Sequence, residues 1–281
     1  LIQELGRGGM AVIFEAQHED HATRCALKIM SKVDQKQEFK QRFHREFKAL
    51  SRLNHPNVLR VFDSGEVNGQ PYFTMEYLKG QTLKEHITSW TPLSPTERFS
   101  KARSILIQMA KALDYIHYLG WVHRDISPAN IMIMPNDTVK LMDFGVVKIP
   151  GTELTVVGEV IGTVAYISPE QIKNDAVDPR ADLYSLGACL YLMLTGERPF
   201  RSRTLSGFLN KHLKEKPTPP SSFFPMIPDD LEKTCLRLLE KDPANRFASA
   251  NHLLQYLNNE NSKHCLRPLI GRTKELHQIR E

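Results

Sequence analysis

The sequence predicts an α+β protein in which a small β-rich region precedes a larger, mostly helical one. In roughly the first 80 residues, short apolar runs alternate with glycine or polar residues, which is typical of strands joined by turns. From about residue 82 onward, apolar residues recur at steps of three and four, the period of an amphipathic helix. Two short apolar runs inside the helical region predict one additional hairpin.

The β-rich region is predicted to hold five strands and one helix. The strand-like runs are residues 1–5, 12–17, 25–30, 58–62 and 72–76, with a turn expected within 65–69. Between the third and fourth runs, five apolar residues follow helical spacing: Phe39, Phe43, Phe47, Leu50 and Leu53.

The helical region begins with a long helix whose apolar face is formed by six residues. These are Ala102, Ile105, Leu106, Met109, Leu113 and Ile116. The hairpin is expected at 131–134 and 139–142, turning at Pro135-Asn136-Asp137. Further helices are predicted at 179–195, 229–240 and 248–258, followed by a polar linker at 258–263.

Composition excludes several classes of protein. The 281 residues are 41% hydrophobic and 25% charged, as in globular proteins, and the net charge of +5 is too small to indicate nucleic-acid binding. Four widely spaced cysteines predict free thiols in a reducing cytoplasm. The longest apolar run, residues 186–194, is too short to span a bilayer. Because the chain starts without Met, we expect it to be part of a longer protein.

A glycine-rich segment joins the first two predicted strands. Gly6, Gly8 and Gly9 would let backbone N–H groups approach an anion that a Cβ would obstruct. A flexible hairpin is the alternative interpretation of these glycines alone. A phosphate loop of the pattern Gly-x-Gly-x-x-Gly would also have a glycine at position 11, where this sequence has Ala11.

Lys28 lies inside the third apolar strand. A lone lysine there could extend its ammonium group to solvent. However, Glu46 lies on the apolar face of the following predicted helix, and a buried carboxylate needs a cation. We therefore predict a Lys28–Glu46 ion pair that holds a phosphate-binding ammonium in place.

Three polar residues flank the predicted hairpin. Asp125 and Asn130 belong to the segment HRDISPAN, and Asp143 to MDFG. Asn130 and Asp143 offer the oxygen ligands that Mg²⁺ prefers, which leaves Asp125 to accept a hydroxyl proton. Any one of them alone could be a turn or capping residue, but their joint order indicates a site.

Together these motifs resemble the signature of the protein kinases, here the bacterial eukaryotic-like (Hanks-type) Ser/Thr kinases. The resemblance covers residues 1–258 and extends to GTVAYISPEQ at 162–171, to Asp182 and to Arg246, which resembles the buried partner of Glu170. It implies the bilobal kinase fold, with an N-lobe at 1–75, a hinge at 76–80 and a C-lobe at 81–258. Residues 259–281 would follow as a linker.

The resemblance also implies the site. Asp125 would orient the acceptor hydroxyl, Lys28 tethered by Glu46 would contact the phosphates, and Asn130 and Asp143 would bind Mg²⁺, with Mn²⁺ as a second candidate. Met75 takes the gatekeeper position. The residues implied to bind ATP are Leu5, Gly6, Arg7, Gly8, Gly9, Met10, Ala11, Val12, Ile13, Ala26, Lys28, Met75, Glu76, Tyr77, Leu78 and Met132.

Regulation is implied by Arg124 and by threonines of the expected activation segment. We predict autophosphorylation at Thr155, with Thr152 second, through self-association of the chain, and we assign Thr163 to the same regulatory set. The phosphate on Thr155 would bind Arg124. Two exposed threonines without a role are the alternative.

Two departures from the family leave alternatives open. Ser127 stands where Ser/Thr kinases usually carry lysine, and Ala11 stands where a glycine is expected, so a nucleotide-binding pseudokinase that acts as a scaffold is a second interpretation. A small-molecule phosphotransferase is a third, but 162–170 resembles a surface that docks a protein substrate with a Ser or Thr. The tail segment 268–276 resembles the opening of an AAA/STAND ATPase module, or else is a plain loop and helix start.

Overall fold

The computed structural model describes residues 1–7, 11–17, 24–30, 47, 50–90, 93–143 and 165–270, with side chains as far as residue 260. The chain divides into two compact units. The first comprises Leu1–Pro92 with His123–Val160, and the second comprises Leu93–Val122 with Ile161–Glu281.

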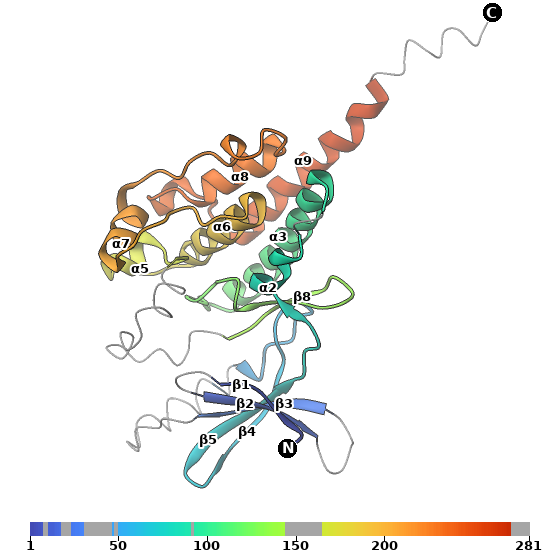
Figure 1. The fold of residues 1–281 in the computed structure, drawn as a ribbon, viewed down its shortest axis with the longest axis vertical. Helices are drawn as coiled ribbons and strands as arrows, with labels where there is room; N and C mark the ends of the chain where they lie inside the picture. The colour runs from blue at the N-terminus through green and yellow to red at the C-terminus, as the bar shows by residue number, and fades with distance from the viewer. Residues whose placement is uncertain are drawn as a thin grey trace, which may run out of the picture. The chain divides into compact units, whose positions relative to one another are not determined.

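A five-stranded antiparallel sheet forms the larger part of the first unit (Figure 1). Its strands are β1 (Gln3–Arg7), β2 (Ala11–Gln17), β3 (Arg24–Met30), β4 (Val61–Val67) and β5 (Gln70–Glu76), in the order β1-β2-β3-β5-β4. The register pairs Ala26 with Met75 and Lys28 with Phe73. Because alternate residues of a strand share a face, Ala26 and Lys28 lie on the same side of the central strand.

The fourth strand differs from the prediction. It begins at Val61 rather than at residue 58, because the preceding residues bind β8 instead: Leu59 N donates to Leu141 O over 2.9 Å. The turn between β4 and β5 lies at Asn68 and Gly69, both with positive φ. Gly65 is inside β4, where a Cβ would lie 2.6 Å from the hydroxyl oxygen of Tyr72, so close packing explains this glycine.

A second, three-stranded sheet completes the first unit. It contains β6 (Gln81–Thr82), β7 (Ile131–Ile133) and β8 (Val139–Leu141), and the predicted hairpin at 131–142 is confirmed. The short helix α2 (Leu83–Thr88) follows β6 directly. Its start is fixed by a capping box in which Thr82 and Glu85 each bind the other's backbone N–H.

The second unit is helical (Figure 1). Its helices are α3 (Pro95–Tyr118), α5 (Pro169–Lys173), α6 (Arg180–Thr195), α7 (Leu205–Lys214), α8 (Asp229–Leu238) and α9 (Ala250–Ile270), with short 3₁₀ turns at Pro220–Ser222 and Pro243–Asn245. The predicted apolar face of α3 is confirmed, since all six of its residues are buried. Helix α3 packs against α6 and α9, and α6 packs against α8.

The end of α9, the last helix among the described residues, corrects another prediction. Residues 258–263 were expected to form a linker, but α9 continues through them to Ile270. This stretch is polar yet contains no glycine or proline, the residues that most often end a helix. Helices α5 and α7 were not predicted. Among the described residues, no helix is both long enough and apolar enough to cross a membrane.

Candidate active site

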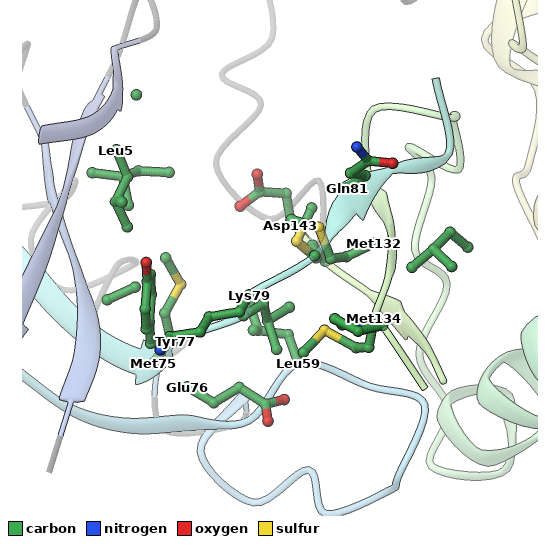
Figure 2. Close-up of a pocket in the computed structure, with 18 of the residues that line it drawn as sticks. Leu5, Leu59, Met75, Glu76, Tyr77, Lys79, Gln81, Met132, Met134 and Asp143 are labelled. Atoms are coloured by element: carbon green, nitrogen blue, oxygen red, sulfur yellow. The ribbon is translucent and has the colours of Figure 1, made fainter. Parts of the chain in front are cut away.

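A cavity of about 730 Å³ lies in the first unit (Figure 2). Its walls come from β1, β2, β3, the end of β5 and the segment after it, β7, and the residues after β8. Figure 2 shows Leu5 at one wall and Met132 and Asp143 at another. Of the residues expected to bind ATP, nine line this cavity: Leu5, Gly6, Ile13, Ala26, Met75, Glu76, Tyr77, Leu78 and Met132.

Other expected contacts lie elsewhere. Arg7 pairs with Glu4 on the exposed face of β1, with Nη2 2.6 Å from Oε2. Ala11 and Val12 are buried in β2, but they do not line the cavity. Gly8, Gly9 and Met10 are outside the described residues.

The structure adds cavity residues that sequence reasoning missed. They are Leu59, Lys79, Gly80, Gln81, His86, Ile133, Met134, Pro135, Asp137 and Met142. Met142 directly precedes Asp143, so its place in the chain could have indicated it. The residues of the β7–β8 hairpin carry no such local signal.

Lys28 reaches the site through an ion pair with Asp143. Its Nζ lies 2.5 Å from Oδ1 of Asp143, and the ammonium also lies 5.8 Å from the ring centroid of Phe73. The Lys28 side chain is 19% exposed, so its charge is largely shielded from water. Glu46 is outside the described residues, and the Lys28–Glu46 pair stays a prediction.

Backbone and side-chain bonds bring Asp125, Asn130 and Asp143 together. Asn130 Nδ2 donates to the backbone oxygen of Asp125 at 2.8 Å and to its Oδ2 at 3.0 Å. The backbone oxygen of Asn130 accepts from Met142 N at 2.8 Å, and Met142 is bonded to Asp143 in the chain. The predicted trio is therefore assembled around one hairpin.

His123 connects the segment of Asp125 to the segment of Asp143 through its two ring nitrogens. It is 1% exposed, and its Nδ1 accepts from Asp125 N at 3.3 Å. Its Nε2 therefore carries the hydrogen and donates to Met142 O at 3.0 Å. Arg124, which lies between His123 and Asp125 in the chain, is exposed and has a φ of 66°, a strained conformation for a residue other than glycine.

The residues present fit a Mg²⁺ ion. Because Asn130 uses its amide nitrogen on Asp125, its carbonyl oxygen Oδ1 is directed elsewhere and keeps its acceptor capacity. This oxygen and the carboxylate of Asp143 are hard ligands, and Mg²⁺ usually completes such a set with water and phosphate oxygens. No group of three or more His, Cys, Asp and Glu side chains suited to a metal occurs among the described residues.

Three features define a protein kinase domain. They are a small sheet that carries the half-buried Lys28, a hairpin flanked by Asp125, Asn130 and Asp143, and a helical second unit. The chain belongs to the protein kinase family, since the family model described as "Protein kinase domain" matches residues 1–257.

The chain is similar to bacterial serine/threonine-protein kinases. It is 38% identical to the probable serine/threonine-protein kinase PknB of Bifidobacterium longum, over 91% of this chain. It is 37% identical to PknB of Mycobacterium tuberculosis, over 88% of this chain. It spans only 39% and 40% of the length of those two relatives. Among solved structures, the kinase domain of Mycobacterium tuberculosis PknI matches with a TM-score of 0.69 and 30% identity, over 92% of this chain and 94% of that one.

Proposed function

We propose that this chain transfers the γ-phosphate of ATP, bound with Mg²⁺, to Ser and Thr hydroxyls of proteins. One observation carries the proposal: the Lys28 ammonium meets the Asp143 carboxylate at 2.5 Å, beside the Asp125 and Asn130 pair. A cation and three oxygen-bearing side chains thus converge next to an apolar cavity suited to a base.

Each residue has a separate task in this mechanism. The apolar walls, including Ala26 and Met132, would enclose the adenine and exclude water. Lys28 would hold the α- and β-phosphates, while Asn130 and Asp143 would hold the metal. When bound, Mg²⁺ neutralises the charge of the phosphate oxygens. Asp125, fixed by Asn130, would orient the acceptor hydroxyl and take its proton.

The test compares wild type with Asp125→Asn, using radiolabelled ATP and myelin basic protein as substrate. Asp125→Asn should lower the rate at least about 10²-fold, because a positioned base contributes about 10²–10⁴-fold. ATP binding should be retained. Asp175→Asn, at an exposed position of the second unit, is the matched control and should change nothing. A wild-type chain that binds ATP but transfers no phosphate would instead support the scaffold interpretation.

We also propose activation by autophosphorylation between two copies of the chain, at Thr155 first and Thr152 second. These residues and Thr163 are outside the described residues. The exposed Arg124 supports the proposal, because a guanidinium binds phosphate oxygens in a bidentate manner. Peptide mapping after incubation with ATP and Mg²⁺ should find phosphate on Thr155, and phosphate found only at other positions would refute this choice.

Three further assignments are proposals of the same kind. Mn²⁺ is a second candidate for the metal site, since it shares the preference for oxygen ligands. A cytoplasmic location is supported by the free Cys25, Cys189 and Cys235 among the described residues. A following ATPase module is supported only by the motif at 268–276, and a Walker A motif in the continuing gene would be its test.

A further inference from the structure

Glu76, the last residue of β5, is held by two other segments of the first unit. Lys140 of β8 places Nζ 2.7 Å from Oε1 of Glu76. The backbone N–H of Arg60 donates to the same oxygen at 2.9 Å. The side chains of Lys140 and Glu76 are 16% and 24% exposed, so the pair is largely shielded from water.

Glu76 is one of the cavity-lining residues, whereas its partner Lys140 is not. Figure 2 shows the Glu76 side chain pointing away from Leu5 and Asp143. The backbone N–H of Glu76 also donates to Arg60 O at 2.9 Å, and Lys140 Nζ lies 3.5 Å from Val58 O. The Glu76 carboxylate therefore joins the end of β5 to the start of β4 and to β8.

The segment that follows Glu76 needs such an anchor. Strand β5 ends at Glu76 and β6 begins at Gln81, so residues 77–80 belong to neither strand, although Tyr77 and Leu78 line the cavity. At its far end the segment is fixed by close packing, because a Cβ on Gly80 would lie 2.4 Å from Ile133 O. At its near end, the Glu76 carboxylate fixes it through Lys140 and the backbone of Arg60, and the Tyr77 side chain adds a hydrogen bond to Glu15.

We infer that Lys140 is a positioning residue for nucleotide binding, acting through Glu76 to hold the cavity wall 76–78 in place for the adenine base. The inference rests on the proposed function, because it assigns the backbone of this wall to the base of ATP. Lys140 does not line the cavity and would not touch the nucleotide. Its removal leaves the phosphate end of the site, with Lys28 and Asp143, intact.

A purely structural ion pair is the competing interpretation. Its loss would then change the unfolding transition without changing nucleotide affinity, because one charge would be left shielded from water without its partner. A pair that positions Asp143 rather than the wall is a second competitor, since β8 leads into Asp143 within three residues. It would change kcat rather than the binding of the base.

The experiment measures the KM for ATP, kcat, and the inhibition constant of adenosine, which has the base and no phosphate. Lys140→Met should raise the KM and the adenosine constant together, by about fivefold, the effect of one hydrogen bond lost from the bound state. The kcat should stay within about twofold. Lys140→Arg, which keeps the cation, should restore most of the affinity, and Lys111→Met on the exposed face of α3 should have no effect.

The pairing itself is tested in a Glu76→Gln background. There Lys140→Met should cause little further change, because the two substitutions break one interaction. An unchanged adenosine constant in Lys140→Met, or a fall in kcat at constant KM, would overturn the inference while leaving the proposed function intact. A wild-type chain that binds neither ATP nor adenosine would overturn both.

Discussion

Arg246 binds Glu170 through both ends of its guanidinium group inside the second unit. Nη1 lies 2.7 Å from Oε1 and Nη2 lies 2.9 Å from Oε2. The remaining donors reach the backbone oxygens of Arg180, Lys241 and Glu240. The Arg246 side chain is fully buried, and each of its five N–H groups has an acceptor, as a buried cation requires. The resemblance to the kinases predicted this buried pairing with Glu170.

Replacing this arginine should destabilise the protein strongly. Arg246→Met leaves the Glu170 carboxylate buried without its cation, which typically costs about 3–5 kcal/mol. Urea unfolding followed by circular dichroism measures the change. The double variant Arg246→Met/Glu170→Gln should recover part of the loss, because no buried charge is then left unpaired.

The control is another arginine–carboxylate pair in the same unit. Arg201 pairs with Glu197 four residues away, but the Arg201 side chain is 68% exposed. Arg201→Met should therefore change the free energy of unfolding by less than about 1 kcal/mol. Equal losses in Arg246→Met and Arg201→Met would contradict the role assigned to burial.

Lys28 gives the second prediction. Lys28→Met removes the cation that meets Asp143 next to the cavity, and kcat should fall about 10²–10³-fold, the range for losing one preorganised donor to a developing charge. Steady-state phosphoryl transfer measures it. Lys214→Met, at the exposed end of α7, is the matched control. Near-normal turnover in Lys28→Met would mean that the phosphates bind elsewhere.

Ser127 gives the third prediction. It is 7% exposed and its backbone oxygen accepts from Asn130 N at 3.0 Å, so it lies within the segment that carries Asp125. A cation introduced here would add charge stabilisation at the transferred phosphate, and Ser127→Lys should raise kcat by about tenfold, less than a full preorganised donor because the burial of its stem costs part of the gain. Ser127→Met has similar length without charge and should not raise kcat. If both variants have the same kcat, a missing positive charge at position 127 does not limit phosphoryl transfer.

The trio of Asp125, Asn130 and Asp143 could be predicted from the sequence because its geometry is local. Asn130 is five residues from Asp125, and the hairpin that follows returns the chain to Asp143. The apolar period of α3 was equally readable, since a 24-residue helix repeats its signal many times.

Contacts between distant segments could not be predicted in this way. Lys28 and Asp143 are 115 positions apart, and no local pattern in the sequence links the two. The Lys28–Glu46 pair stays a prediction, because Glu46 is outside the described residues. The turn of the β7–β8 hairpin adds Met134, Pro135 and Asp137 to the cavity lining. The sequence of this segment indicates a turn and nothing about a cavity. Strand β4 was misplaced because residues 57–59 bind β8, a partner some 80 residues later in the chain.

His212 of α7 gives the last prediction, on pH. It is fully buried, and burial together with the nearby Lys241 ammonium lowers the pKa of its imidazole from 6.5 to about 3. Tyr184 contacts its Nδ1 at 3.0 Å, the rings of Phe200 and Phe208 pack on it, and the backbone of Ala165 partly opposes the shift. The folded protein therefore keeps this histidine neutral.

Between pH 6.5 and about 3 the unfolded chain binds a proton at His212 that the folded chain does not. Stability from this residue is thus complete above pH 6.5 and falls as the pH decreases, by about 2 kcal/mol between pH 7 and pH 5. Urea unfolding at both pH values measures the loss in wild type and in His212→Gln, which keeps an acceptor for Tyr184 but does not titrate. The variant should lose about 2 kcal/mol less than wild type over this interval. An identical loss would mean that His212 becomes protonated without unfolding, which its burial against Lys241 argues against.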